Sequence, residues 1–123
     1  MVTSEELTCA ERCFILRRRL GLNLREAAKY FNVSPTYRYQ RYELAIPGAI
    51  IGVDINKLLA ITPLPRELCI IARRRTGLSQ AQVGEELGFT KLWIGRMENG
   101  VGNPDPLVKW WNINYTRFAE VDW

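Results

Sequence analysis

The chain of 123 residues contains no histidine, so the side chain used most often as a general base is missing. It has no apolar run long enough to span a bilayer and no signal-peptide pattern, so we expect a cytoplasmic protein. Its three cysteines leave one unpaired in any disulfide scheme, which fits a reducing compartment. Paired carboxylates, nucleophile elbows and phosphate-binding loops are also missing, and we expect neither enzymatic activity nor a cofactor.

A metal site is the remaining possibility that the cysteines raise. Cys9 and Cys13 lie one helical turn apart, but Cys69 is the only further cysteine and no histidine completes a ligand set. We therefore expect buried structural thiols and no metal.

The charged residues that are present favour an anionic partner. The formal net charge is +4, from 17 basic and 13 acidic residues. Of those 17 basic residues, 13 are arginine, the side chain whose planar fork matches phosphate and guanine. This composition is compatible with nucleic acid and does not by itself establish it.

The chain repeats itself. Residues 73–79 (RRRTGLS) resemble residues 17–23 (RRRLGLN) at an offset of 56, and each copy is followed by the pattern of a helix, a tight turn and a second helix. The proline-rich stretch 62–65 marks the boundary, so we predict two domains, 1–62 and 63–123. Units of about 60 residues bury little surface and are marginally stable alone.

Local signals predict an all-α fold in both halves. N-caps and proline starts are expected at Ser4, Asn23, Ser34-Pro35, Asp54, Pro65, Ser79 and Thr90, and helix ends or turns at Gly21, Asn32, Gly77, Gly88 and Asn99-Gly100. A tail rich in aromatic residues (Trp110, Trp111, Tyr115, Phe118 and Trp123) follows residues 102–106. We expect this tail to begin as a helix and to end irregularly.

Residues 78–100 (LSQAQVGEELGFTKLWIGRMENG) resemble the DNA-binding domain of the phage repressor/Cro family, also called the XRE family. The shared pattern is a capped helix beginning with glutamine, a glycine turn, a recognition helix with an inward aliphatic residue, and an ending of Glu-Asn-Gly type. The resemblance covers about residues 65–106. It implies two tandem five-helix-type helix-turn-helix domains of the lambda repressor kind, the second followed by the Trp-rich tail.

The resemblance also implies which residues touch DNA. Ser79 and Gln80 would meet a phosphate at the start of the second helix, and Arg96 would read guanine while Leu92 contacts a thymine methyl. Trp93 is placed outward, where an interface or packing role is the alternative to base contact. Arg73 and Glu98 match a structural ion pair of the family. The full set expected at the DNA from this half is Ser79, Gln80, Thr90, Lys91, Leu92, Trp93, Arg96, Asn99 and Gly100.

The first copy resembles the family less closely. Arg17 and Glu43 match the ion pair, but Leu24 replaces the glutamine, Leu44-Ala45 replaces Asn-Gly, and one extra residue lies between Ser34 and Glu43. An inserted residue rotates a helix by about 100° relative to its cap, which leaves open which side chains face DNA. The candidates are Asn23, Thr36, Tyr37, Arg38 and Arg41. The alternative is a degenerate copy used for packing or dimerisation.

These patterns predict a sequence-specific regulator of transcription that binds double-stranded DNA at the nucleoid, most simply a phage or plasmid repressor that occludes a promoter. The aromatic tail is a candidate homodimer surface, or it lines the second core. The main alternative is a protein-binding adaptor or inhibitor on the same scaffold, with RNA polymerase or a nuclease as its target. RNA binding through Tyr37, Tyr39 and Tyr42 is less favoured, because no RNA-binding module is evident.

Overall fold

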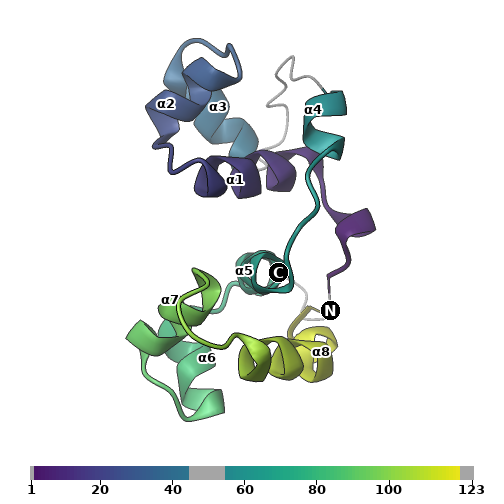
Figure 1. The fold of residues 1–123 in the computed structure, drawn as a ribbon, viewed down its shortest axis with the longest axis vertical. Coiled ribbons are helices and arrows are strands. Elements are labelled where there is room, and N and C mark those ends of the chain that lie inside the picture. The colour runs from purple at the N-terminus through teal and green to yellow at the C-terminus, as the bar shows by residue number, and fades with distance from the viewer. Residues whose placement is uncertain (1, 45–54, 120–123) are drawn as a thin grey trace. The chain divides into compact units, whose positions relative to one another are not determined.

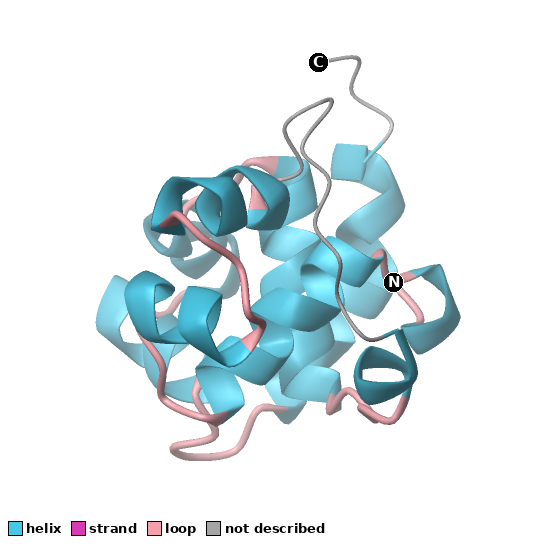
Figure 2. Cartoon of the chain, turned by 90° about the horizontal axis from the view of Figure 1, so that it is seen from above, coloured by secondary structure: helices cyan, strands magenta, loops and turns pink. Residues whose placement is uncertain are grey.

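The computed structural model describes residues 2–44 and 55–119, and in this part of the chain helices are joined by turns and loops, with no strand (Figures 1 and 2). A short 3-10 helix at Ser4–Glu6 comes first. The α-helices are α1 (Cys9–Arg19), α2 (Leu24–Tyr30), α3 (Thr36–Glu43), α4 (Ile55–Leu59), α5 (Pro65–Thr76), α6 (Gln80–Leu87), α7 (Lys91–Glu98) and α8 (Asp105–Ala119).

The chain divides between Thr62 and Pro63 into two compact units. The first unit is Leu7–Thr62, and the second is Pro63–Trp123 together with Met1–Glu6. The N-terminal segment therefore lies with the second unit, and not with the first as the domain range 1–62 assumed. A hydrogen bond from Arg75 Nη2 to the Glu6 carbonyl, 2.9 Å long, holds the segment there.

In the first unit, α1 packs against α3 and α4, and α2 packs against α3. The core of this unit is formed by apolar side chains from all four helices. Its fully buried members include Cys13, Ala27, Tyr39 and Leu58. The short turn between α2 and α3 lets these two helices pack against each other while α3 also contacts α1.

In the second unit, α5 packs against α7 and α8, while α6 packs against α7. Trp111 of α8 is completely buried, as are Ile71, Val83 and Ile94. The aromatic tail therefore begins as a helix, as predicted, and its central tryptophan lines the core. Ile113 on the same helix is 71% exposed. The predicted irregular end and Trp123 lie outside the described residues.

Local capping signals that do not depend on the rest of the fold were predicted correctly. Asn23, Ser79 and Thr90 are N-caps whose side chains accept a backbone N–H three residues on. Asn32, with φ 59°, and Gly88, with φ 79°, occupy the left-handed conformation at the turns that follow α2 and α6. Pro65 begins α5, as predicted.

Two predicted caps are wrong, each because a neighbouring residue competes. Ser4 opens only the 3-10 helix, whereas α1 begins at Cys9 behind Thr8, whose reciprocal bonds with Glu11 form a capping box. Ser34 does not cap α3, because Pro35 itself holds the N-cap position and the helix begins at Thr36. The predicted cap at Asp54 lies outside the described residues.

The five-helix expectation also differs from what the described residues show, which is four α-helices in each unit. In the second unit the 15 residues of α8 run on as one helix. No helix in the described ranges is both long enough and apolar enough to cross a membrane.

Candidate nucleic-acid interface

The turn between α6 and α7 is tight because a glycine lets the chain pass close to it. A Cβ atom on Gly84 would lie 2.4 Å from the carbonyl oxygen of Phe89, closer than real Cβ contacts come. The Phe89 N–H in turn donates to the Gly84 carbonyl at 2.9 Å. Gly88, in the left-handed conformation, reverses the chain just before Phe89. These contacts fix the direction in which α7 leaves the turn.

One face of α7 is buried and the other is presented to solvent. Ile94 and Met97 are 0% and 1% exposed and anchor the inner face. The outer face carries four predicted DNA contacts, all exposed: Lys91, Leu92, Trp93 and Arg96.

The apolar members of this outer face are unusually open for large side chains. Leu92 is 67% exposed and Trp93 is 40% exposed. The Arg96 guanidinium lies 5.8 Å from the centroid of the Trp93 ring, within reach of a cation–π contact. The arginine, the tryptophan and Leu92 therefore form one exposed surface on α7 that joins a cation to apolar area.

The end of α7 is held by a buried carboxylate. Glu98 is 1% exposed and accepts from Arg73 Nε at 2.7 Å and from Arg73 Nη2 at 3.2 Å. Gln80 Nε2, at the start of α6, donates to the same carboxylate at 2.9 Å. The predicted pair is thus present, and Gln80 extends it into a link between α5, α6 and α7.

Arg66 is a contributor that the sequence patterns missed. Its Nη1 donates to the Glu98 carbonyl at 3.1 Å, and a Cβ on Gly100 would lie 2.9 Å from its Nε. Gly100 has φ 80°, and its amide, expected at a DNA phosphate, donates to the Met97 carbonyl at 3.3 Å. Asn99 is the exposed C-cap of α7. Arg66 could not be singled out from the sequence, because only folding brings α5 to the end of α7.

Ser79 and Thr90 serve as caps at the two helix starts of this region. Ser79 Oγ accepts from the Gln82 N–H at 3.1 Å, and Thr90 Oγ1 accepts from the Trp93 N–H at 3.2 Å. Both residues are exposed. The first amides of α6 and α7 therefore start at the surface, where helix ends attract anions.

The first unit repeats the arrangement of the ion pair. Arg17 donates to Glu43 from Nε at 2.9 and 3.1 Å and from Nη2 at 2.7 Å, and the Glu43 side chain is 5% exposed. Leu24 stands where Gln80 stands in the second unit, so the glutamine link is missing. Tyr39 is buried beside this pair, and burial, followed by the nearby Glu43 carboxylate, raises the pKa of its phenol.

The position of the extra residue is now defined, and the expected rotation of the third helix is wrong. The bond from Val33 N to Ala28 O matches that from Phe89 N to Gly84 O, at the offset of 56. Beyond the turn, α3 and α7 both span eight residues and end at the paired glutamates, at an offset of 55. The extra residue therefore lies in the turn, at Ser34, and α3 keeps the register of α7.

This register settles how the candidates of the first unit correspond to those of the second. Arg41 corresponds to Arg96, Tyr37 to Leu92 and Arg38 to Trp93. Three of these side chains are exposed: Arg41, Arg38 and Tyr37, the last at 58%. Thr36, which corresponds to Lys91, is half-buried. Arg38 Nη1 donates to the Ser34 carbonyl at 3.3 Å. Asn23 is exposed and caps α2, with its Oδ1 accepting from the Glu26 N–H.

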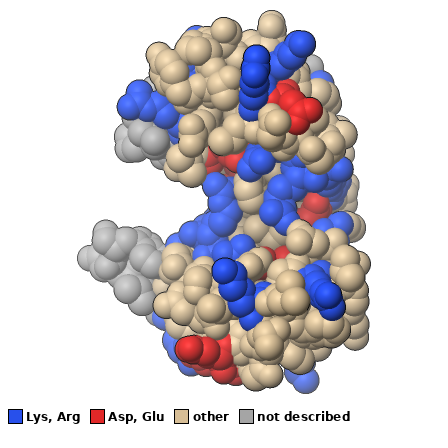
Figure 3. Space-filling model, turned by 90° about the vertical axis from the view of Figure 1, so that its left-hand side faces the viewer, with Lys and Arg blue, Asp and Glu red and all other residues tan. Residues whose placement is uncertain are grey.

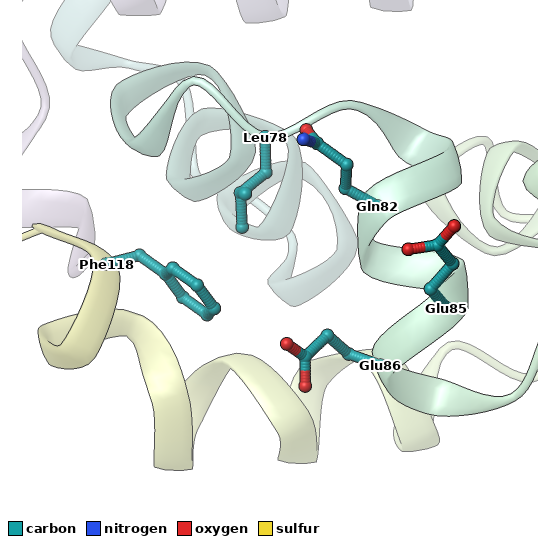
Figure 4. Close-up of a pocket in the computed structure, with 5 residues that line it drawn as sticks. All are labelled: Leu78, Gln82, Glu85, Glu86 and Phe118. Carbon is teal, nitrogen blue, oxygen red and sulfur yellow. The ribbon is translucent and has the colours of Figure 1, made fainter.

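Figure 3 shows basic side chains on the surface of each unit, with fewer acidic side chains in view. Among the acidic side chains of the second unit, Glu85 and Glu86 of α6 border a hollow of about 450 Å³ that Leu78 and Phe118 also line (Figure 4). Arg117 Nη2 pairs with Glu86 at 3.1 Å. Because carboxylates repel phosphate, this side of α6 does not suit a nucleic-acid backbone.

The cysteines lie apart from these exposed surfaces. Cys13 and Cys69 are completely buried, and burial is the main cause that raises the pKa of each thiol to about 12. Among the described residues no group of three or more histidine, cysteine, aspartate or glutamate side chains is placed to hold a metal.

Comparison with known families identifies the α5–α8 region. A family model described as a helix-turn-helix domain matches residues 71–109, from within α5 to within α8. The second unit carries a helix-turn-helix domain. Such a domain supports DNA binding. No curated protein and no solved structure matches the chain.

Proposed function

We propose that the protein is a sequence-specific regulator of transcription that binds double-stranded DNA and represses by occluding a promoter. The observation that carries the proposal is the exposed outer face of α7, held on a buried inner face within a helix-turn-helix domain. A helix presented in this way fits the major groove, where base edges are read.

Each side chain of that face has a task that its chemistry supports. Arg96 offers two parallel donors for O6 and N7 of guanine, and the contact with Trp93 limits the directions it can take. Leu92 is exposed enough to meet a thymine methyl. Lys91 stands at the N-terminal end of α7, the part of a recognition helix that enters the groove first.

Contacts to the DNA backbone come from the helix starts and ends around this face. The start of α6, capped by Ser79, offers outward amides to a phosphate. Gln80 uses one hydrogen of its amide group to hold Glu98, and the second remains for a phosphate oxygen. Thr90 and Asn99 border the two ends of the recognition helix.

The first unit supplies a second DNA-binding module in this proposal, and the chain is a tandem regulator of the phage repressor/Cro kind. What supports this is the recurrence of the Arg–Glu pair and the shared register of α3 and α7. One such domain reads only a short half-site, so two modules are needed for useful specificity. Homodimerisation through α8, where Ile113 is exposed, and a contact with RNA polymerase are further parts of the proposal.

The test begins with selection of bound sequences from random duplex DNA. We expect one enriched site that contains guanine, and we expect binding to fall steeply as salt increases, because each phosphate contact contributes about 0.9 to the slope of log K against log salt. Scrambled duplex of equal length is the control. The adaptor alternative would be favoured instead if no DNA sequence were enriched, or if the chain bound another protein with an affinity that does not depend on salt.

A further inference from the structure

The α2–α3 turn of the first unit borders a hollow of about 500 Å³ that two cationic side chains line. Arg25 and Lys29 stand four residues apart on α2, so they lie on one face of that helix. Ser34 and Thr36, from the turn and the start of α3, add two hydroxyl groups to the lining. These four residues are called the basic cradle.

The cations of the basic cradle are available to a ligand. Arg25 and Lys29 are both exposed, and the side chain of neither forms an ion pair or a hydrogen bond within the described part of the chain. Two neighbouring cations that no carboxylate pairs with repel each other, and an anion between them relieves that repulsion. The hydroxyls beside them are neutral donors of the kind that often bind phosphate oxygens.

The second unit has no such site at the matching place. At the offset of 56, Ala81 stands where Arg25 stands and Glu85 where Lys29 stands, and Glu85 lines the acidic hollow beside α8. The extra residue, Ser34, also belongs to the first unit alone. The first unit therefore differs from the second both in the two cations on α2 and in the longer turn after it. It is also the unit in which Leu24 stands at the place of Gln80.

We propose that the basic cradle binds a backbone phosphate of duplex DNA, so that the first unit holds the backbone while α7 of the second unit reads the sequence. This rests on the proposed function. Because a phosphate is the same at every base pair, the cradle adds affinity equally to all sequences. It also gives the less well-matched copy of the repeat a function that needs no recognition of bases.

The test compares the full chain with the double variant Arg25→Ala/Lys29→Ala in titrations against selected and scrambled duplexes at several salt concentrations. Loss of the one phosphate held by the cradle lowers the salt slope by about one unit. We expect that fall, with equal losses of affinity for both duplexes. The control is Lys109→Ala/Arg117→Ala, which removes the same charge from α8. An equal fall in the control, or an unchanged slope in the cradle variant, would overturn the proposal.

Two further measurements separate this proposal from the proposed function and from binding of free phosphate. If the wild-type protein binds no duplex, the proposed function is wrong. If the wild type binds and the cradle variant has the same salt slope, the proposed phosphate contact is wrong and the proposed function is not affected. Inorganic phosphate is titrated into wild type while the amide NMR signals of Ser34 and Thr36 are followed. We expect shifts that the double variant loses. Such shifts without any change of DNA slope would mean a free-anion site and would refute the backbone contact.

Discussion

Arg73 on α5 and Glu98 at the end of α7 are joined by two hydrogen bonds, of 2.7 and 3.2 Å, and Arg17 and Glu43 are joined in the same way in the first unit. In each unit the carboxylate is buried and the arginine is half-buried. Each pair thereby ties the first helix of its unit to the end of the third, and so it sets how the outer face of that third helix is turned.

The two halves of this pair are expected to differ in importance. Arg73→Ala leaves Glu98 buried with Gln80 as its only remaining side-chain donor among the described residues, and loss of a buried partner costs about 3–5 kcal/mol. Glu98→Ala leaves an arginine that can turn to water, so we expect a smaller loss. Thermal unfolding of both variants, with exposed Lys109→Ala as a control, measures the order. Unchanged melting of Arg73→Ala would contradict the alignment of α5 with α7.

Two glycines of the helix-turn-helix region offer a matched comparison. Gly84→Ala puts a Cβ 2.4 Å from the backbone oxygen of Phe89, so the turn must move, at a cost of about 1–3 kcal/mol. Gly95→Ala meets only the Gln80 amide at 3.3 Å, which can yield, and alanine gains about 0.5–1 kcal/mol of helix preference. Chemical denaturation should therefore rank Gly84→Ala well below Gly95→Ala. A reversed order would mean that the turn is not closed in this way.

How much of the fold the sequence predicted depends on whether each signal is local. Asn23, Ser79 and Thr90 were identified because a cap and its bonded N–H lie three residues apart. The Arg–Glu pairs were found only through family resemblance. Ser4 failed because the pair Thr8–Glu11 offers a better start for α1 a few residues later.

The candidate site was predictable where it follows the helical repeat and not where it depends on packing. The outer face of α7 was predicted because Ile94 and Met97 fix the inner face. The place of the extra residue was not predicted. Aligning the two repeats does not show whether an inserted residue lengthens the turn or rotates the helix. The basic cradle was missed because Arg25 and Lys29 meet Ser34 only when α2 and α3 fold together.

The three cysteines provide a test of burial that needs no DNA. Cys13 and Cys69 are completely buried and their thiols have a pKa of about 12, so they remain protonated at pH 8. The ordinary pKa of a cysteine thiol is 9.0, so the folded protein holds this proton more tightly than the unfolded chain does. The resulting contribution to stability is lost as the pH rises from 9 towards 12. Iodoacetamide at pH 8 should modify half-buried Cys9 first, as peptide mass spectrometry would show. Rapid modification of all three without denaturant would contradict this core.

The reading face of the second unit is tested by two substitutions with different expected signatures. Arg96→Ala removes a contact to a base edge, so we expect a loss of about 1–3 kcal/mol and relaxed preference at one base position. Gln80→Ala weakens all sequences evenly, since it removes a backbone contact and loosens Glu98. Fluorescence anisotropy with matched and single-mismatch duplexes separates the two. Equal losses on every duplex for both variants would reduce Arg96 to a backbone contact.

The register that α3 shares with α7 predicts which arginine of the first unit contacts DNA, which the amino-acid composition of α3 does not. Arg41 holds the place of Arg96, while Arg38 holds that of Trp93 and already donates to the Ser34 carbonyl.

If the first unit reaches the groove as well as the backbone, Arg41→Ala should shorten the protected footprint and lower the salt slope by about one unit. Arg38→Ala should leave the footprint unchanged and serves as the matched control, one turn away on the same helix. Nuclease protection of a labelled duplex measures both. An effect of Arg38→Ala as large as that of Arg41→Ala would contradict this prediction and show that Arg38, at the place of Trp93, also contacts DNA. No effect of either, alongside a loss in the cradle variant, would assign the first unit to the backbone alone.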